Sequence, residues 1–163
     1  MKRILVVLCC LLAPLFMQAG EYSQRPIPSD VVEAFFIMNN HPTNSDMTLL
    51  QAEEKLKGTI VVQISMDRCT TCIKMKQAMD RANIVNLWSE KGVRFYQIDA
   101  DEEYPAKHVN DFYGWIKENT KIETVPLIMI FKNGKFAGMR NGYEVEPTEE
   151  YDAKFIKILE SIS

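Results

Sequence analysis

An apolar, β-branched run that ends just before two cysteines constrains this chain more than any other feature. Residues 60–64 read Ile-Val-Val-Gln-Ile, a composition typical of a strand that is covered on both faces. Beyond the cysteines, apolar residues recur at helical spacing at Met75 and Met79. The pattern predicts a buried strand that runs into a helix, with Cys69 at the helix start and Cys72 one turn inside.

This cysteine spacing favours a redox-active dithiol. Residues at positions i and i+3 lie on one face of a helix, so the two sulfurs can reach bonding distance without backbone movement. The free N–H groups and the positive end of the helix dipole favour the thiolate of the first cysteine by about 0.3–2 kcal/mol. We therefore expect Cys69 to be the nucleophile and Cys72 the resolving thiol. Arg68 would lower the pKa of Cys69 and Asp67 would raise it, so the neighbouring charges leave the size of the shift open.

The first twenty residues differ from the rest and are typical of a secretory signal peptide. Lys2 and Arg3 precede an apolar run over residues 4–17, and small residues follow at Ala19 and Gly20. The run is short for a membrane span, but an anchor formed by residues 4–17 is the minor alternative, because the cleavage box is imperfect. We expect residues 1–20 to be removed on export to the periplasm, so that the chain meets the membrane only transiently through its signal peptide.

Removal of this leader would leave Cys69 and Cys72 as the only cysteines, since Cys9 and Cys10 lie within it. Exported proteins normally oxidise their thiols into structural bridges, yet a bridge across so short a loop stabilises very little. The pair is therefore expected to serve chemistry. The mature chain would carry 17 basic and 22 acidic residues, a net charge of −5. Nucleic-acid binding is therefore not expected, since it usually requires an excess of basic residues.

The rest of the chain predicts one domain of ordinary size preceded by an arm. Residues 21–46 form the arm, with a short helix opened at residues 28–30 whose apolar side chains are expected to pack in the core. Residues 47–163 form the domain. A helix is predicted over residues 47–57, before the first strand. After the cysteines, an apolar stripe continues over 84–92 and a strand parallel to the first follows over 93–99. The remaining predicted elements are a helix over 106–118, a hairpin around Asn133-Gly134 and a helix over 147–162.

In this order the motifs resemble the thioredoxin superfamily. They are the strand into Cys69-x-x-Cys72, Asp99 at the end of the next strand, and Val125-Pro126 before the third. The likeness spans residues 47–163 and implies an α/β, thioredoxin-like fold, in which a central mixed sheet is flanked by helices.

The resemblance also implies a site. A cis proline at Pro126 would face the dithiol, and the backbone of Val125 would pair with an extended substrate segment. Arg68, Thr70 and Thr71 beside the cysteines complete the expected substrate-binding set.

Several residues depart from the family pattern. Thr70-Thr71 replaces the Gly-Pro of cytosolic thioredoxins, Gln63 stands at the position of the family's buried acid, and Gln97 at that of its lysine partner. A neutral amide cannot accept a proton from Cys72, so any base assistance must come from water or from another group. Cytosolic thioredoxin itself is therefore disfavoured.

The sequence favours an extracytoplasmic thiol–disulfide oxidoreductase that acts on protein substrates by attack of Cys69 and resolution by Cys72. Such an enzyme uses no cofactor but needs a redox partner, and the direction of electron flow stays open between reductase, oxidase and isomerase. One alternative is a Cu(I)-binding thioredoxin-like protein that adds Met66, Met75 and Met129 to the pair. No metal is expected, however, because the only histidines, His41 and His108, lie in unrelated segments. The other alternative is a thioredoxin-like interaction module without turnover.

Overall fold

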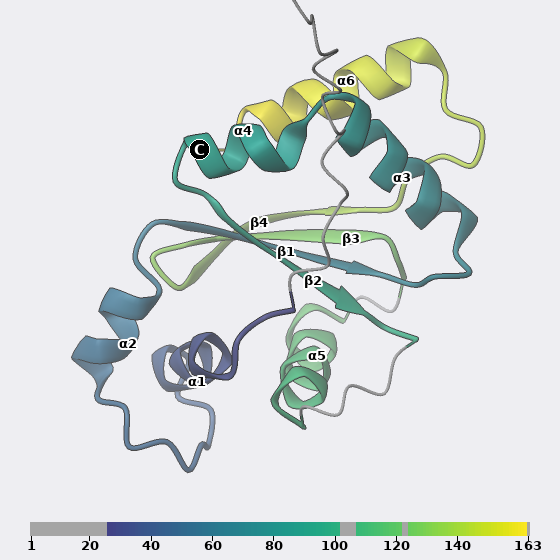
Figure 1. Ribbon diagram of the computed structural model, residues 1–163. Helices are drawn as coiled ribbons and strands as arrows, with labels where there is room; N and C mark the ends of the chain where they lie inside the picture. Colours follow the sequence, from purple (N-terminus) through teal and green to yellow (C-terminus); the bar gives the residue numbers. More distant parts are fainter. Residues whose placement is uncertain (1–25, 102–106, 122–123, 163) are drawn as a thin grey trace, which may run out of the picture.

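The computed structural model describes residues 26–101, 107–121 and 124–162 and shows a four-stranded sheet between two layers of helices (Figure 1). The elements in chain order are α1 (Ser29–Met38), α2 (Leu49–Lys55), β1 (Thr59–Ser65), α3 (Thr70–Arg81), α4 (Ile84–Glu90), β2 (Arg94–Asp99), α5 (Lys107–Thr120), β3 (Leu127–Lys132), β4 (Lys135–Asn141) and α6 (Glu149–Glu160). Each helix and strand predicted within these ranges is present. The predicted leader, residues 1–20, and the possible anchor at 4–17 lie outside the described residues and stay predictions.

The strands run in the order β2-β1-β3-β4. β1 and β2 are parallel, as the strand–helix–strand order predicts, and β3 is antiparallel to both β1 and β4. Asn133 and Gly134 close the β3–β4 hairpin with φ of 50° and 76°, the left-handed backbone that such a two-residue turn requires. This order and these directions are those of a thioredoxin-like fold, and the predicted fold class is confirmed.

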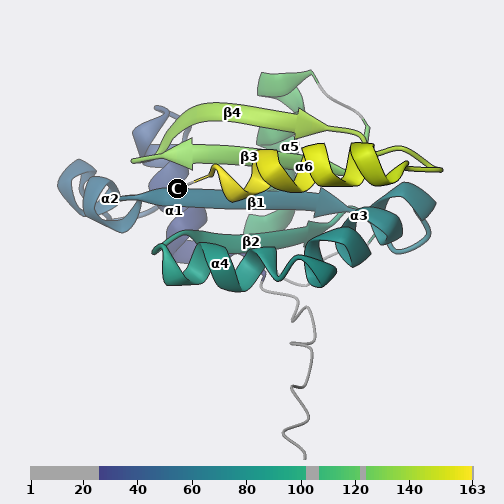
Figure 2. The same cartoon turned by 90° about the horizontal axis from the view of Figure 1, so that it is seen from above.

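Helices cover both faces of the sheet. Figure 2 shows α3, α4 and α6 together over one face, and α1, α2 and α5 lie on the other. Within the first group, Trp88 of α4 donates a hydrogen bond from Nε1 to the Leu159 carbonyl of α6 at 2.9 Å. Beneath the second, the ring of Phe35 lies 5.3 Å from that of Phe112 and 4.6 Å from that of Phe131. Each face of the sheet therefore has its own aromatic core.

Helix α1, predicted within the arm, packs into this second core. Its apolar residues Val31, Val32, Phe35 and Phe36 are buried, which confirms the expected internal packing. Polar contacts hold the same region: Lys55 pairs with Asp30 at 2.6 Å, and the His108 ring nitrogen Nε2 lies 3.2 Å from the Ile27 carbonyl. The division of the chain at residue 47 stays a prediction, but α1 and the sheet share one core.

Candidate active site

Cys69 and Cys72 form a disulfide where β1 runs into α3, with their Cα atoms 5.2 Å apart. Cys69 is the N-cap of α3, and its sulfur accepts a hydrogen bond from the backbone N–H of Cys72 at 3.1 Å. The Thr71 hydroxyl lies 3.1 Å from the same sulfur. Both neighbours can donate a hydrogen bond to sulfur, so in the reduced protein they would stabilise negative charge on Cys69.

The two cysteines differ in exposure. Cys69 is half-buried, whereas Cys72 is fully buried on the stripe of α3 that carries Met75 and Met79. A substrate can therefore approach the sulfur of Cys69 while that of Cys72 stays inside. This asymmetry suits the predicted division into an attacking and a resolving thiol.

The loop before α3 and its first turn place the other predicted site residues around Cys69. Arg68 and Thr70 are exposed, and Thr71 is half-buried against the sulfur. Their predicted role in substrate binding stays a prediction.

Val125 and Pro126 lie at the same end of the sheet as the dithiol. Leu127 pairs with Ile64, so the two residues before it flank the end of β1, from which the chain continues to Cys69. The Val125–Pro126 peptide bond is cis, as the resemblance implies, and the Pro126 carbonyl accepts a hydrogen bond from the Gly142 N–H at 2.8 Å. Their part in substrate binding remains a prediction.

Three further residues near the dithiol were missed from the sequence. The side chains of Ile73 on α3 and of Val145 after β4 are 44% and 54% exposed. Lys74 joins these segments, because its Nζ donates to the Val145 carbonyl and lies 3.3 Å from Glu146 Oε1. Ile73 lies one helical turn after Cys69, and the Lys74 contact, which only the fold creates, holds the segment of Val145 against the same helix.

Beneath α3 lies a polar cluster, defined as Gln63, Ser65, Gln97 and Asp99. In the described part of the chain these are the only polar side chains that are buried, each at most 3% exposed. Gln63 lies opposite Gln97 and Ser65 opposite Asp99 in the parallel β1–β2 pair, and all four share the face of Val61 and Phe95, which packs against α3 and α4. Gln97 Nε2 donates to Ser65 Oγ at 3.3 Å. Gln63 and Gln97 are therefore neighbours in the sheet.

Burial raises the pKa of the Asp99 carboxyl above its usual range. The Asp101 backbone N–H, which donates to Asp99 Oδ1 at 3.0 Å, opposes this shift, as does the charge of Lys76 on α3. The nearby Asp67 carboxyl raises the pKa further, in part through repulsion by its charge. This pairing was not predicted. The sequence could have indicated it, because the carboxyl ends of two parallel strands lie at the same edge of a sheet. Asp67 follows β1 and Asp99 ends β2, so the two acids come together there.

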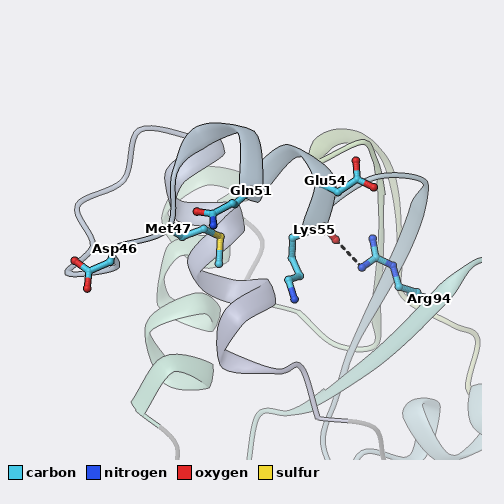
Figure 3. Close-up of a pocket in the computed structure, with 6 residues that line it drawn as sticks. All are labelled: Asp46, Met47, Gln51, Glu54, Lys55 and Arg94. Atoms are coloured by element: carbon cyan, nitrogen blue, oxygen red, sulfur yellow. Dashed lines mark hydrogen bonds between the residues drawn. The ribbon is translucent and has the colours of Figure 1, made fainter.

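Figure 3 shows a surface pocket at the other end of the sheet. Arg94, the first residue of β2, is one of the residues that line it, whereas the dithiol follows the last residue of β1. Arg94 donates to the carbonyls of Lys55 and Lys57 at 2.7 and 2.9 Å, and Lys55 pairs with Asp30. Both cations are thus engaged in holding the C-terminal end of α2, and the pocket stands apart from the dithiol.

Two of the methionines considered as copper ligands lie in different cores. Met75 packs in the core under α3 and Met129 in the core on the opposite face of the sheet. Within the described ranges, no group of three or more His, Cys, Asp or Glu side chains is arranged to hold a metal ion. In the same ranges, no helix is long and apolar enough to cross a membrane.

No protein-family model and no curated protein matches this sequence. Among solved structures, the chain is similar to the thioredoxin Mala s 13 of Malassezia sympodialis, with 18% identity and a TM-score of 0.45 over 71% of this chain and 85% of that one. It is also similar to the thioredoxin of Fasciola hepatica, with 17% identity and a TM-score of 0.44 over 71% of this chain and 91% of that one. For mitochondrial thioredoxin 3 of Saccharomyces cerevisiae the identity is 15% and the TM-score 0.43, over 68% of this chain and 87% of that one. The chain has a thioredoxin-like fold, established by its own strand order and directions, and it carries a Cys-x-x-Cys pair where β1 runs into α3.

Proposed function

We propose that this protein is an extracytoplasmic thiol–disulfide oxidoreductase that exchanges disulfides with protein substrates through Cys69 and Cys72. The observation that supports this most is the disulfide between an accessible N-cap cysteine and a buried partner one helical turn away. The Cys69 thiolate attacks a substrate disulfide and forms a mixed disulfide, and one substrate sulfur leaves as a thiolate. Cys72 then attacks Cys69, which releases the second substrate sulfur. The substrate gains two electrons, the pair loses two, and the reverse sequence oxidises a substrate.

The surroundings of Cys69 support an extended, partly apolar protein segment as the substrate. The exposed side chains of Ile73 and Val145 offer apolar contacts, and Val125 is proposed to offer its backbone. Arg68 and Thr70 complete this surface. The protein needs no cofactor in this scheme, but a redox partner must return the pair to its starting state.

The trapping of substrates tests the proposal. In the exporting cell, Cys72→Ser should accumulate mixed disulfides between Cys69 and substrate proteins, because no thiol remains to displace them. Non-reducing electrophoresis with mass spectrometry identifies these adducts. The matched control, Cys69→Ser, should trap none. Absence of adducts on Cys72→Ser, or faster alkylation of Cys72 than of Cys69 between pH 5 and 7, would overturn the proposal.

A reduction potential decides the direction of electron flow. Equilibration of the purified protein with glutathione buffers should give a value near −270 mV for a reductase of the thioredoxin kind, or near −120 mV for a strong oxidase. About 30 mV corresponds to 1.4 kcal/mol for a two-electron couple, so the two cases are well separated.

Export from the cytoplasm is the other part of the proposal. Mass spectrometry of the mature protein should find an N-terminus near Gly20 or Glu21 in the periplasmic fraction. Intact Met1 in the membrane fraction would instead indicate an anchor formed by residues 4–17, with the same domain outside.

A further inference from the structure

Strand β4 is a free edge of the sheet. In the part of the chain that the structure describes, β4 pairs with β3 and with no other strand, and Figure 2 shows it as the outermost strand. The Gly142 N–H donates to the Pro126 carbonyl, and hydrogen-bonded pairs alternate with non-bonded pairs along an antiparallel ladder. Arg140 is therefore hydrogen-bonded to β3, whereas the backbone N–H and C=O groups of Met139 and Asn141 face away from it and are available to another extended chain.

The two halves of this edge differ. Near the hairpin turn, a bulge between Ile130 and Phe131 interrupts the register, and the Lys135 side chain is exposed. Bulges and exposed lysines are devices by which edge strands avoid pairing with other chains. The register is regular from Gly138 to Asn141, so we define residues 138–141 as the open edge.

One face of the open edge is apolar. Met139 lies opposite Met129, which belongs to the core on the side of α1 and α5, yet its own side chain is 46% exposed. Phe136 precedes it on the same face and is 52% exposed, with its ring 6.1 Å from that of Phe131. An apolar side chain on an incoming strand would remove part of this surface from water, which favours binding.

The other face carries a cation with an unused donor. Arg140 lies opposite Ile128 on the side of α3 and α6, and its guanidinium is 5.9 Å from the centre of the Phe155 ring. Its Nε is buried and has no hydrogen-bond partner among the described residues, although such donors are normally paired. A Cβ atom placed on Gly138, which shares this face of the strand, would meet no atom within 4 Å. The strand therefore leaves room beside Arg140 for an acceptor.

We propose that the open edge binds an extended segment of a partner protein in which an acidic residue lies between two apolar residues. The main chain of this segment pairs with Met139 and Asn141. The Cβ atom of its residue opposite Arg140 lies about 4.5–5.5 Å from that of Arg140 on the same face, so a carboxylate there can accept from the guanidinium. The two flanking residues lie on the opposite face, beside Met139. This interaction is separate from disulfide exchange and does not depend on it.

Charge favours an acidic partner over a second copy of this chain. The charged residues of β4 are Lys135 and Arg140, both basic, although the whole chain has a net charge of −3. Two copies of β4 paired with each other would bring like charges together, which is unfavourable. A segment with a central carboxylate instead complements the strand.

The full chain can be tested with three short capped peptides that contain no cysteine. The first has the sequence Thr-Thr-Val-Glu-Val-Thr-Thr, the second has Lys in place of Glu, and the third has Pro in place of both Val residues. In NMR titrations the Glu peptide should bind at least about fivefold more tightly than the Lys peptide, because only the carboxylate pairs with Arg140. The Pro peptide should bind at least about fivefold more weakly than the Glu peptide, since proline has no N–H for strand pairing.

Amide hydrogen exchange locates the contact. In the free protein the N–H groups of Met139 and Asn141 should exchange faster than that of Arg140, which is bonded to β3. Near saturation, the Glu peptide should slow exchange at Met139 and Asn141 at least about fivefold and change it at Arg140 by less than about twofold.

Arg140→Gln removes the proposed partner of the carboxylate. This variant should bind the Glu and Lys peptides within about twofold of each other, because the charge that distinguishes them is absent. Lys91→Gln is the matched control, since it loses the same charge just before β2, at the opposite edge of the sheet. It should keep the preference of the wild type for the Glu peptide.

Four results would overturn the proposal. They are equal binding of the Glu and Lys peptides to the wild type, equal binding of the Glu and Pro peptides, an unchanged preference in Arg140→Gln, and a dimer of the protein alone in sedimentation with slow exchange at Met139 and Asn141. The last would show that a second copy occupies the edge. The peptide comparisons on the wild type decide the matter even where Arg140→Gln does not fold. Because the peptides lack cysteine, the outcome is independent of whether Cys72→Ser traps substrates.

Discussion

Two neighbours of different kinds hold the sulfur of Cys69. The backbone N–H of Cys72 is part of the helix and cannot be removed by a substitution that keeps the helix. The hydroxyl, in contrast, depends on the side chain at position 71 and can be removed by mutation. Thr71 stands in one of the two positions between the cysteines, so its contribution to the reactivity of Cys69 can be separated from that of the helix.

Thr71→Val should raise the pKa of Cys69 in the reduced protein, because it removes a hydroxyl that can donate a hydrogen bond to the thiolate. The pH dependence of iodoacetamide alkylation in the reduced protein measures the change. Thr70→Val is the control, since the Thr70 side chain is exposed. An equal pKa in the Thr71 and Thr70 variants would show that the hydroxyl does not stabilise the thiolate.

The cysteine pair was predictable as a site because its signal is local: two residues one helical turn apart. The polar cluster was not. Gln63 and Gln97 were identified as replacements, but their contact with Ser65 and Asp99 depends on the register between two strands, which no local pattern contains. The Asp67–Asp99 pair is of the same kind, since a charge beside Cys69 in sequence acquires its partner only through the fold.

At the level of elements, periodicity predicted the strands and helices well and their ends less well. Helix α2 begins at Leu49, later than the predicted residue 47, because Thr48 and Gln51 form a capping box there. The apolar stripe after α3 becomes a separate helix, α4, because Asn83 adopts a left-handed backbone with φ of 54°. The spacing of apolar residues predicts neither the capping box nor the left-handed residue.

The contribution of α1 to the common core can be measured at Phe35, whose side chain is fully buried. Phe35→Ala should lower the free energy of unfolding by about 3–5 kcal/mol, because it removes the ring that contacts both Phe112 and Phe131. Urea unfolding followed by circular dichroism measures the loss.

Phe136 provides a matched control on the edge strand β4, where its side chain is 52% exposed. Phe136→Ala should cost less than about 1 kcal/mol, since most of its surface already meets water. Similar losses in the two variants would show that α1 does not stabilise the sheet core.

In the molecule as a whole, two acids give stability opposite dependences on pH. Asp30 accepts a hydrogen bond from Lys55, which lowers its pKa against a smaller opposing effect of burial. Its contribution is present above the ordinary value of 3.8 and is lost as the pH falls through the lowered one. The pKa of Asp99 is raised, so its contribution is complete below the ordinary value of 3.8 and is lost as the pH rises through the raised one.

Replacement of Asp99 should therefore change the slope of stability against pH. Asparagine cannot ionise, so Asp99→Asn should gain stability relative to wild type as the pH rises from 4 to 8: the free energy of unfolding of the variant minus that of wild type should increase. Each unit by which the folded pKa exceeds the unfolded one adds about 1.4 kcal/mol. Urea unfolding of the oxidised protein at several pH values measures this slope, and any lost contact adds only a constant. Asp30→Asn should slope the opposite way, with a small amplitude because the pair is partly exposed; parallel curves for wild type and Asp99→Asn would show that Asp99 ionises as it does in the unfolded chain.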